Sequence, residues 1–273
     1  MPEQSLRLAM VVLTSAVAGS MNAIAGGGTL LTFPALVGLG IAPIVANATS
    51  TVALCPGSFG SIMGYRAELA GARKWAMGFA VPSLLGGGVG AWLLLHTPPS
   101  RFARLVPWLV FAATALFMVQ RPLMTALRRY SGAPAPIGSN TSSSATPGAG
   151  DAVRTQRAPT PAILVFQFVI SIYGGYFGAG VGILMLAALG LMGLTNIHRM
   201  NGLKNWGGLC MNVVAAALFG FSSLVNWPVA LAMAGGALTG GYVGSRVAQR
   251  VPQKYVRYAI VVIGLGGGVW LMV

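Results

Sequence analysis

The chain is 273 residues long, and 55% of its residues are hydrophobic while only 7% are charged. A soluble domain carries about 25% charged residues, so this composition excludes an ordinary soluble protein and indicates one that lies in a lipid bilayer. Seventeen basic and three acidic residues give a formal net charge of +14. The bases lie mainly in short loops and form no continuous basic face, so we expect no nucleic-acid partner.

Ten apolar segments follow one another along the chain, and they predict an all-α, polytopic membrane protein. The first five are expected at residues 6–24, 29–39, 43–63, 75–95 and 102–119, and the second five at residues 162–177, 183–194, 197–219, 228–247 and 255–272. The first segment is similar to the apolar part of a signal peptide. Its counterpart lies deep inside the chain, however, so we expect both to be structural elements.

The second five segments repeat the first five at a constant offset of 154 residues. Matching positions are Ala25 and Ala179, Gly26 and Gly180, Gly28 and Gly182, Asn47 and Asn201, Gly86 and Gly240, and Gly90 and Gly244. We therefore expect a first transmembrane repeat at residues 1–120 and a second at residues 161–273. Residues 131–161 are rich in Ser, Thr, Pro, Gly and Ala, which predicts a disordered linker at residues 121–160.

The second segment of each copy is too short to cross a membrane. Residues 29–39 would form a helix of about 17 Å, whereas a hydrocarbon core is about 30 Å thick. We therefore interpret the opening of each copy as a broken, re-entrant helical hairpin, followed by three transmembrane helices. Three crossings place the second copy upside down relative to the first, which predicts two inverted-topology repeats.

Loop charges favour the same arrangement. The loop after the third segment carries Arg66, Arg73 and Lys74, whereas its counterpart at residues 220–228 carries no base. Cytoplasmic loops are enriched in Lys and Arg, so equivalent loops of the two copies are expected on opposite sides of the membrane. The same rule predicts that the linker is cytoplasmic.

Two sequence motifs of the first copy resemble those of a known family. They are Ala-Gly-Gly-Gly-Thr at residues 25–29, followed by Pro34, and Ala-Asn-Ala-Thr-Ser-Thr at residues 46–51. The second copy carries a degenerate version, with Met-Asn-Gly-Leu-Lys-Asn at residues 200–205. The chain resembles the sulfite exporter TauE/SafE family. That resemblance implies a bacterial inner-membrane protein that exports sulfite or a small organosulfonate such as sulfoacetate.

The glycine breaks are candidate anion sites on physical grounds as well. A helix that begins inside a membrane presents unpaired backbone N–H groups and the positive end of its dipole, and glycine lets an oxyanion approach the backbone. The candidates are Gly26, Gly27, Gly28, Thr29, Gly180 and Gly182. The alternative is that these glycines only permit close helix packing. For Gly86, Gly90 and their counterparts, packing is the favoured interpretation.

Polar residues at the start of the third segment of each copy supply further donors. They are Asn47, Thr49, Ser50 and Thr51 in the first copy and Asn201, Lys204 and Asn205 in the second. Such side chains also make hydrogen bonds between helices, so this role stays open for each of them. Lys204 is the strongest candidate, since no acid lies near it in the sequence. It either pairs with the anion or extends to the membrane surface.

The three acidic residues lie outside the apolar segments, so no carboxylate is expected inside the membrane. A carboxylate proton relay is therefore not expected, and export is predicted to be driven by the membrane potential acting on the anion through alternating access. No metal site, cofactor or catalytic group is indicated, and the chain is not expected to be an enzyme. The alternatives are a transporter of another sulfur solute, such as thiosulfate, or a non-transporting membrane subunit. A homo-oligomer is compatible with the sequence.

Overall fold

The computed structural model describes residues 2–130, 159–191, 194, 196–247 and 253–271, and in these ranges the chain is helical without strands. The first half holds α1 (Pro2–Ile24), α2 (Gly28–Gly38), α3 (Pro43–Gly64), α4 (Arg66–Ala70), α5 (Arg73–Leu95) and α6 (Pro99–Tyr130). The second half holds α8 (Pro161–Tyr176), α9 (Val181–Leu191), α10 (Ile197–Gly220), α11 (Trp227–Val247) and α12 (Gln253–Trp270). The predicted all-α fold is confirmed.

The ten predicted segments correspond to ten of these helices, with boundaries that agree within a few residues except at the end of α6. The short helix α4 was not predicted. The helix α6 continues to Tyr130, past the linker boundary expected at residue 121. Most of the predicted linker, residues 131–158, lies outside the described residues.

Apolar helices make up most of the described fold. Two of them, Arg73–Leu95 and Pro99–Val119, are long and apolar enough to cross a membrane, and several shorter helices are also apolar. Large hydrophobic side chains lie on the outer surface, such as Leu13 and Trp108, each 67% exposed. Apolar surface of this extent is typical of a protein whose solvent is lipid.

Each half opens with a pair of helices that is broken at glycine. In the first half, Gly26 has a φ of 82°, and α2 turns back along α1. The two helices lie so close that a Cβ on Gly28 would be 2.6 Å from the carbonyl oxygen of Ala18. In the second half, Gly178 and Gly180 have φ values of 80° and 74° between α8 and α9. Left-handed backbone of this kind favours glycine. Because α2 and α9 have 11 residues each, they are only about 16 Å long.

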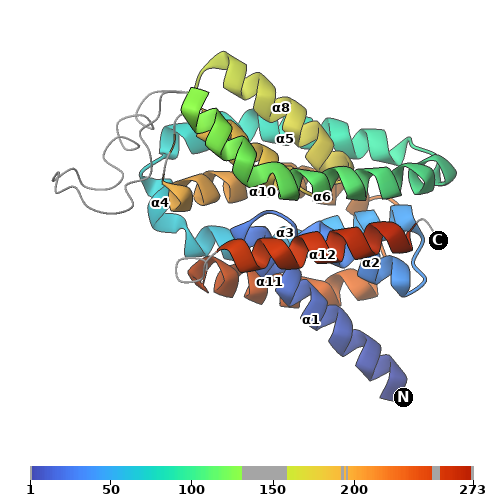
Figure 1. Ribbon diagram of the computed structural model, residues 1–273. Helices are drawn as coiled ribbons and strands as arrows, with labels where there is room; N and C mark the ends of the chain where they lie inside the picture. Colours follow the sequence, from blue (N-terminus) through green and yellow to red (C-terminus); the bar gives the residue numbers. More distant parts are fainter. Residues whose placement is uncertain (1, 131–158, 192–193, 195, 248–252, 272–273) are drawn as a thin grey trace.

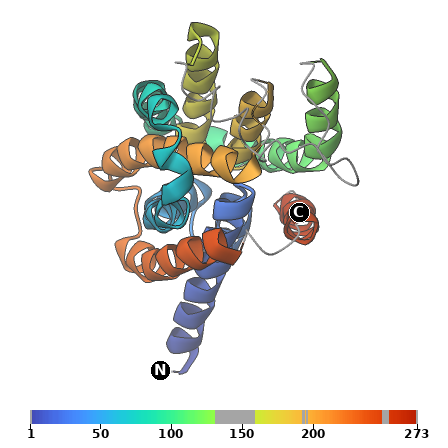
Figure 2. The same ribbon diagram turned by 90° about the vertical axis from the view of Figure 1, so that its left-hand side faces the viewer.

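The opening helix of each half packs against a helix of the other half. The helix α1 packs against α11 of the other half, and α8 packs against α5 (Figures 1 and 2). Small residues permit these contacts: a Cβ on Gly240 would collide with the carbonyl oxygen of Ala16, and one on Gly86 would lie 2.5 Å from that of Phe168. These glycines therefore have the packing role that their sequence pattern indicated.

The helices α3 and α10 run antiparallel through the centre of the molecule. Gly202, near the start of α10, lies beside Tyr65, which follows the end of α3. At the opposite end, the hydroxyl of Thr49 near the start of α3 accepts a hydrogen bond of 3.0 Å from the backbone of Asn226, after the end of α10. These two helices therefore point in opposite directions.

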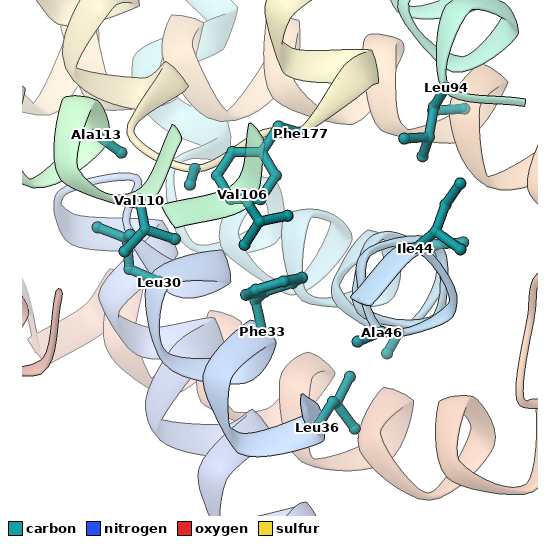
Figure 3. Close-up of a cluster of buried hydrophobic side chains, with 14 of the residues drawn as sticks. Leu30, Phe33, Leu36, Ile44, Ala46, Leu94, Val106, Val110, Ala113 and Phe177 are labelled. Atoms are coloured by element: carbon teal, nitrogen blue, oxygen red, sulfur yellow. The ribbon is translucent and has the colours of Figure 1, made fainter. Parts of the chain in front are cut away.

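The largest buried hydrophobic cluster joins α2, α3, α6 and the break between α8 and α9 (Figure 3). Phe33 of α2 meets Phe177 edge to face, with ring centroids 5.6 Å apart. Val106 and Val110 of α6 and Ile44 of α3 belong to the same cluster. The cluster ties the two broken helix pairs to each other, which fixes where their glycine breaks meet.

Candidate functional site

The glycine breaks of the two halves meet in direct backbone contact. A Cβ built on Gly26 would lie 2.5 Å from the Cα of Gly182, and one built on Gly182 would lie 2.6 Å from the Cα of Gly26. Such distances leave no room for a side chain at either position. Two segments that lie far apart in the sequence are thereby joined at one point.

A cavity of about 30 Å³ lies beside this contact. The glycine breaks contribute Gly26, Thr29, Gly178 and Gly182 to its lining, and α1 contributes Asn22. The helices α3 and α10 supply most of the rest. A volume of this size holds about two water molecules, so the cavity suits a solute of a few non-hydrogen atoms.

Lys204 is the charged residue of this lining. Its side chain is only 3% exposed, and its Nζ atom donates hydrogen bonds of 3.0 Å and 3.1 Å to the carbonyl oxygens of Asn22 and Ala23. Asn205 donates a further bond of 3.2 Å to the carbonyl of Ala23. The last carbonyls of a helix lack partners within it and carry the negative end of its dipole, so Lys204 and Asn205 cap the end of α1.

The position of Lys204 differs from the alternative in which its side chain extends to the membrane surface. The side chain does not extend to the surface, because its ammonium group is held by the end of α1. An ammonium group has three N–H donors, and two of them are used by the carbonyls of Asn22 and Ala23. The third remains for a group in the cavity, and none of the described lining residues is acidic.

A matching cap lies at the end of α8. Asn47 of α3 is fully buried, and its Nδ2 atom donates a hydrogen bond of 2.9 Å to the carbonyl oxygen of Tyr176. Asn47 therefore acts on the opening helix of the second half as Lys204 and Asn205 act on that of the first. Each half caps the broken helix of the other.

The predicted site residues divide into two groups. Those that line the cavity are Gly26, Thr29, Thr51, Gly182, Lys204 and Asn205. Seven others lie outside it: Gly27, Gly28, Asn47, Thr49, Ser50, Gly180 and Asn201.

Several of the residues outside the cavity have structural partners instead. Ser50 shares a short hydrogen bond with the hydroxyl of Thr32. Gly180 packs against Ala113 of α6, and Gly27 precedes the first residue of α2. Asn201 is 1% exposed.

Several lining residues were not predicted from the sequence, and the repeat itself contains a signal for them. Three repeat positions line the cavity from both halves: Thr51 and Asn205, Leu54 and Gly208, and Ser58 and Asn212. Positions three and seven residues apart share one face of a helix. Extending the helix face of Thr51 and Asn205 along the repeat would have identified the other two pairs. Met185 and Met211 complete the apolar part of the lining.

The described lining of the cavity carries one positively charged side chain and no negatively charged one. One buried ammonium group stands among neutral donors, which include the amides of Asn22, Asn205 and Asn212 and the hydroxyls of Thr29 and Ser58. A buried cation without a carboxylate partner is unfavourable in a low-dielectric environment unless an anion or several dipoles compensate it. The helix-end carbonyls supply dipoles, and a bound anion would supply the opposite charge.

Comparisons with known proteins identify a family and several relatives of the chain. The family described as "Sulfite exporter TauE/SafE" matches residues 11–271. A "Probable membrane transporter protein" from Haemophilus influenzae is 24% identical to this chain, and the match covers 94% of this chain and 91% of the relative. A relative of the same description from Sinorhizobium is 27% identical over 97% of this chain and 92% of its own length.

A third relative, the "Probable membrane transporter protein YfcA" of Escherichia coli, is 26% identical over 94% of this chain and 87% of its own length. No solved structure matches the chain. Similarity over nearly the full length of these relatives means that both halves, and the cavity between them, fall inside the matched region.

Proposed function

The chain belongs to the sulfite exporter TauE/SafE family, and we propose that it exports a small sulfur oxyanion, sulfite or a short organosulfonate, through the cavity beside Lys204. As a family member it is a membrane transporter. An anion is proposed because the described lining contains one buried ammonium group, that of Lys204. This group bonds helix-end carbonyls, and no acidic residue lies among its described neighbours in the cavity.

In this proposal the anion accepts the third N–H of Lys204 and further donors from both halves. Those donors are the side chains of Thr29 and Asn205 and the backbone at Gly182, where the lack of a side chain admits an oxyanion. The hydroxyl of Thr51 and the N–H of Gly26 already donate to backbone carbonyls, so these two residues shape the cavity instead. The predicted residues outside the cavity hold the helices that carry these groups. They are Asn47, Thr49, Ser50, Asn201, Gly27, Gly28 and Gly180. The small cavity favours sulfite, and a longer organosulfonate requires the lining to move apart.

Movement of that kind is expected from two inverted-topology repeats that rock around a central site. Support comes from the antiparallel course of α3 and α10 and from the exchanged packing of α1 and α8. The cavity lies where the broken helices of the two repeats meet. Alternating access then consists of opening first one side of this contact and then the other.

The proposed driving force is the membrane potential. An anion that leaves a cell with a negative interior gains about 2.3 kcal/mol per charge for each 100 mV. The described lining holds no carboxylate that would bind a coupled proton or sodium ion. We place the protein in the bacterial inner membrane, with the basic loop around Arg66 and Arg73 and the linker on the cytoplasmic side.

Flux measurements in proteoliposomes test this proposal. Sulfite and sulfoacetate efflux is measured at imposed potentials of either sign, for the intact protein, Lys204→Gln and Lys74→Gln. Glutamine retains a donor for the carbonyls of α1 but removes the charge, so Lys204→Gln is expected to raise KM about tenfold or more. Lys74 is exposed at the start of α5 and serves as the matched control.

Flux that follows the potential and falls only in Lys204→Gln supports an electrogenic anion site at Lys204. Flux that ignores the potential contradicts uncoupled export. Equal flux in all three proteins contradicts the assignment of Lys204.

A further inference from the structure

Ser58 of α3 is an exception among the buried serine and threonine side chains of the described residues. It is 3% exposed and lines the cavity, yet its hydroxyl makes no hydrogen bond within the described part of the chain. The other buried serine and threonine side chains of that part have partners. Ser61, for example, donates to the carbonyl of Gly57 at 2.9 Å, and Thr114 donates to that of Val110 at 2.8 Å.

A buried hydroxyl group in a helix ordinarily bonds the carbonyl of the preceding turn. Ser58 does not make this bond, and a polar group removed from water without a partner is unfavourable. Because Ser58 lines the cavity, the missing partner is expected to be a molecule or ion that enters it.

Asn212 of α10 is the repeat counterpart of Ser58, at the same offset of 154 residues. It also lines the cavity, and its side-chain amide has no hydrogen-bond partner in the described ranges. The two halves therefore present an unbonded donor from the same repeat position to the same cavity. This pair does not belong to the glycine breaks or to the motif that contains Asn47.

The register of the two antiparallel helices brings these residues to similar levels. Gly202 of α10 lies beside Tyr65. From that point Asn212 is about 15 Å along α10, and Ser58 is about 10 Å back along α3, so their levels differ by about one helical turn.

Lys204 lies about 12 Å from Asn212 along α10. That separation exceeds the width of a small oxyanion, so we expect the ammonium group and Asn212 to contact the anion at different points of its passage. Between the two lies Gly208, where an added Cβ would meet no atom within 4 Å, so the lining is open there.

We propose that Ser58 and Asn212 form a second, charge-free anion position, which the anion occupies after it leaves Lys204. A hydroxyl and an amide both donate to an oxyanion, and neither adds a charge that would retain it. The pair would thus stabilise the anion during its passage without binding it tightly. This inference rests on the proposed function, since it assigns two further binding residues to the same transport path.

The test compares Ser58→Ala, Asn212→Ala and the control Ser61→Ala in the full-length protein. Ser61 lies one turn beyond Ser58 on α3, but its hydroxyl bonds the carbonyl of Gly57 and it does not line the cavity. Sulfite binding is measured at equilibrium in detergent, and sulfite flux is measured in proteoliposomes. Ser58→Ala removes a hydroxyl without a protein partner, so we expect this variant to fold normally.

The expected result is that Ser58→Ala and Asn212→Ala lower the maximal flux about tenfold each, because each removes one hydrogen bond to a charged group. Their dissociation constants for sulfite stay within about twofold of that of the intact protein, since Lys204 still holds the anion at rest. Ser61→Ala is expected to transport at the normal maximal rate.

Two results overturn the inference alone: maximal flux in both variants equal to that of Ser61→Ala, or a loss of equilibrium binding as large as that in Lys204→Gln. The second result would place all these residues around one position. If the intact protein neither binds nor transports sulfite or sulfoacetate, the proposed function fails, and the second position fails with it.

Discussion

The backbones of Gly26 and Gly182 are in contact, so that the breaks in α1–α2 and α8–α9 lie against each other beside the cavity. Neither residue has space for a side chain, and Gly26 also has the left-handed φ of 82°. One contact between two glycines thus joins the moving parts of the proposed transporter.

Gly26→Ala is expected to lower stability more than Gly40→Ala does. Both residues have left-handed backbone, with φ values of 82° and 83°, but a Cβ on Gly40 would meet nothing within 4 Å. The strain of the left-handed conformation is about 1 kcal/mol in each, and the collision with Gly182 is added only at Gly26. The measurement is the midpoint of thermal unfolding in detergent. Equal midpoints in the two variants would show that the glycine contact is looser than described.

Gly208→Leu is expected to block transport. The position is open to the cavity, so the leucine side chain occupies the path of the anion. The matched control is Gly235→Leu, at an equally open position on α11 that does not line the cavity. Flux near background for Gly208→Leu, with normal flux for the control, is the expected result. Undiminished flux in Gly208→Leu would place the path elsewhere.

Asn47→Ala is expected to act on stability more than on affinity. It removes the donor for the carbonyl of Tyr176, which costs about 1 kcal/mol or more when the group stays buried. Thr239→Ala removes an exposed hydroxyl that bonds only its own helix and serves as the control. The unfolding midpoint should fall for Asn47→Ala while the sulfite KM changes less than about threefold. A rise in KM as large as that of Lys204→Gln would make Asn47 a binding residue.

Cysteine labelling tests the inverted repeats directly. Ala67 and Phe221 occupy the same repeat position, and both are exposed, Phe221 to 94%. In a background without Cys55 and Cys210, a membrane-impermeant maleimide should label Ala67→Cys only from the cytoplasmic side and Phe221→Cys only from the opposite side. Labelling of both from one side would mean that the repeats are parallel.

Much of the helical fold was predictable because its boundaries are local. Proline at or next to helix starts, as at Pro43 and Pro161, and glycine at helix ends, as at Gly64 and Gly220, act within a few residues of the chain. The helix α4 was missed because its five residues are too few to show a periodic pattern. The extent of α6 was missed because its last part is not apolar enough to stand out from a linker.

The candidate site was predictable only in part, since contacts between the halves decide which polar residues face the cavity. Lys204 was identified from the sequence, but its bonds to the end of α1 join residues about 180 positions apart, as the separations of 181 and 182 show. Ser50 and Ser58 are both serines of α3, yet the hydroxyl of Ser50 forms a hydrogen bond with that of Thr32 in α2. No local pattern distinguishes the bonded hydroxyl from the unbonded one.

The exchanged caps also bear on how the protein assembles. The end of α1 is complete only when Lys204 and Asn205 have been synthesised, whereas the end of α8 finds Asn47 already in place. Until most of the chain has left the ribosome, the carbonyl of Ala23 therefore lacks both of its side-chain partners. A polypeptide with a single copy could close its own broken helix only by pairing with a second molecule, so the presence of both copies in one chain removes the need for a dimer at this contact.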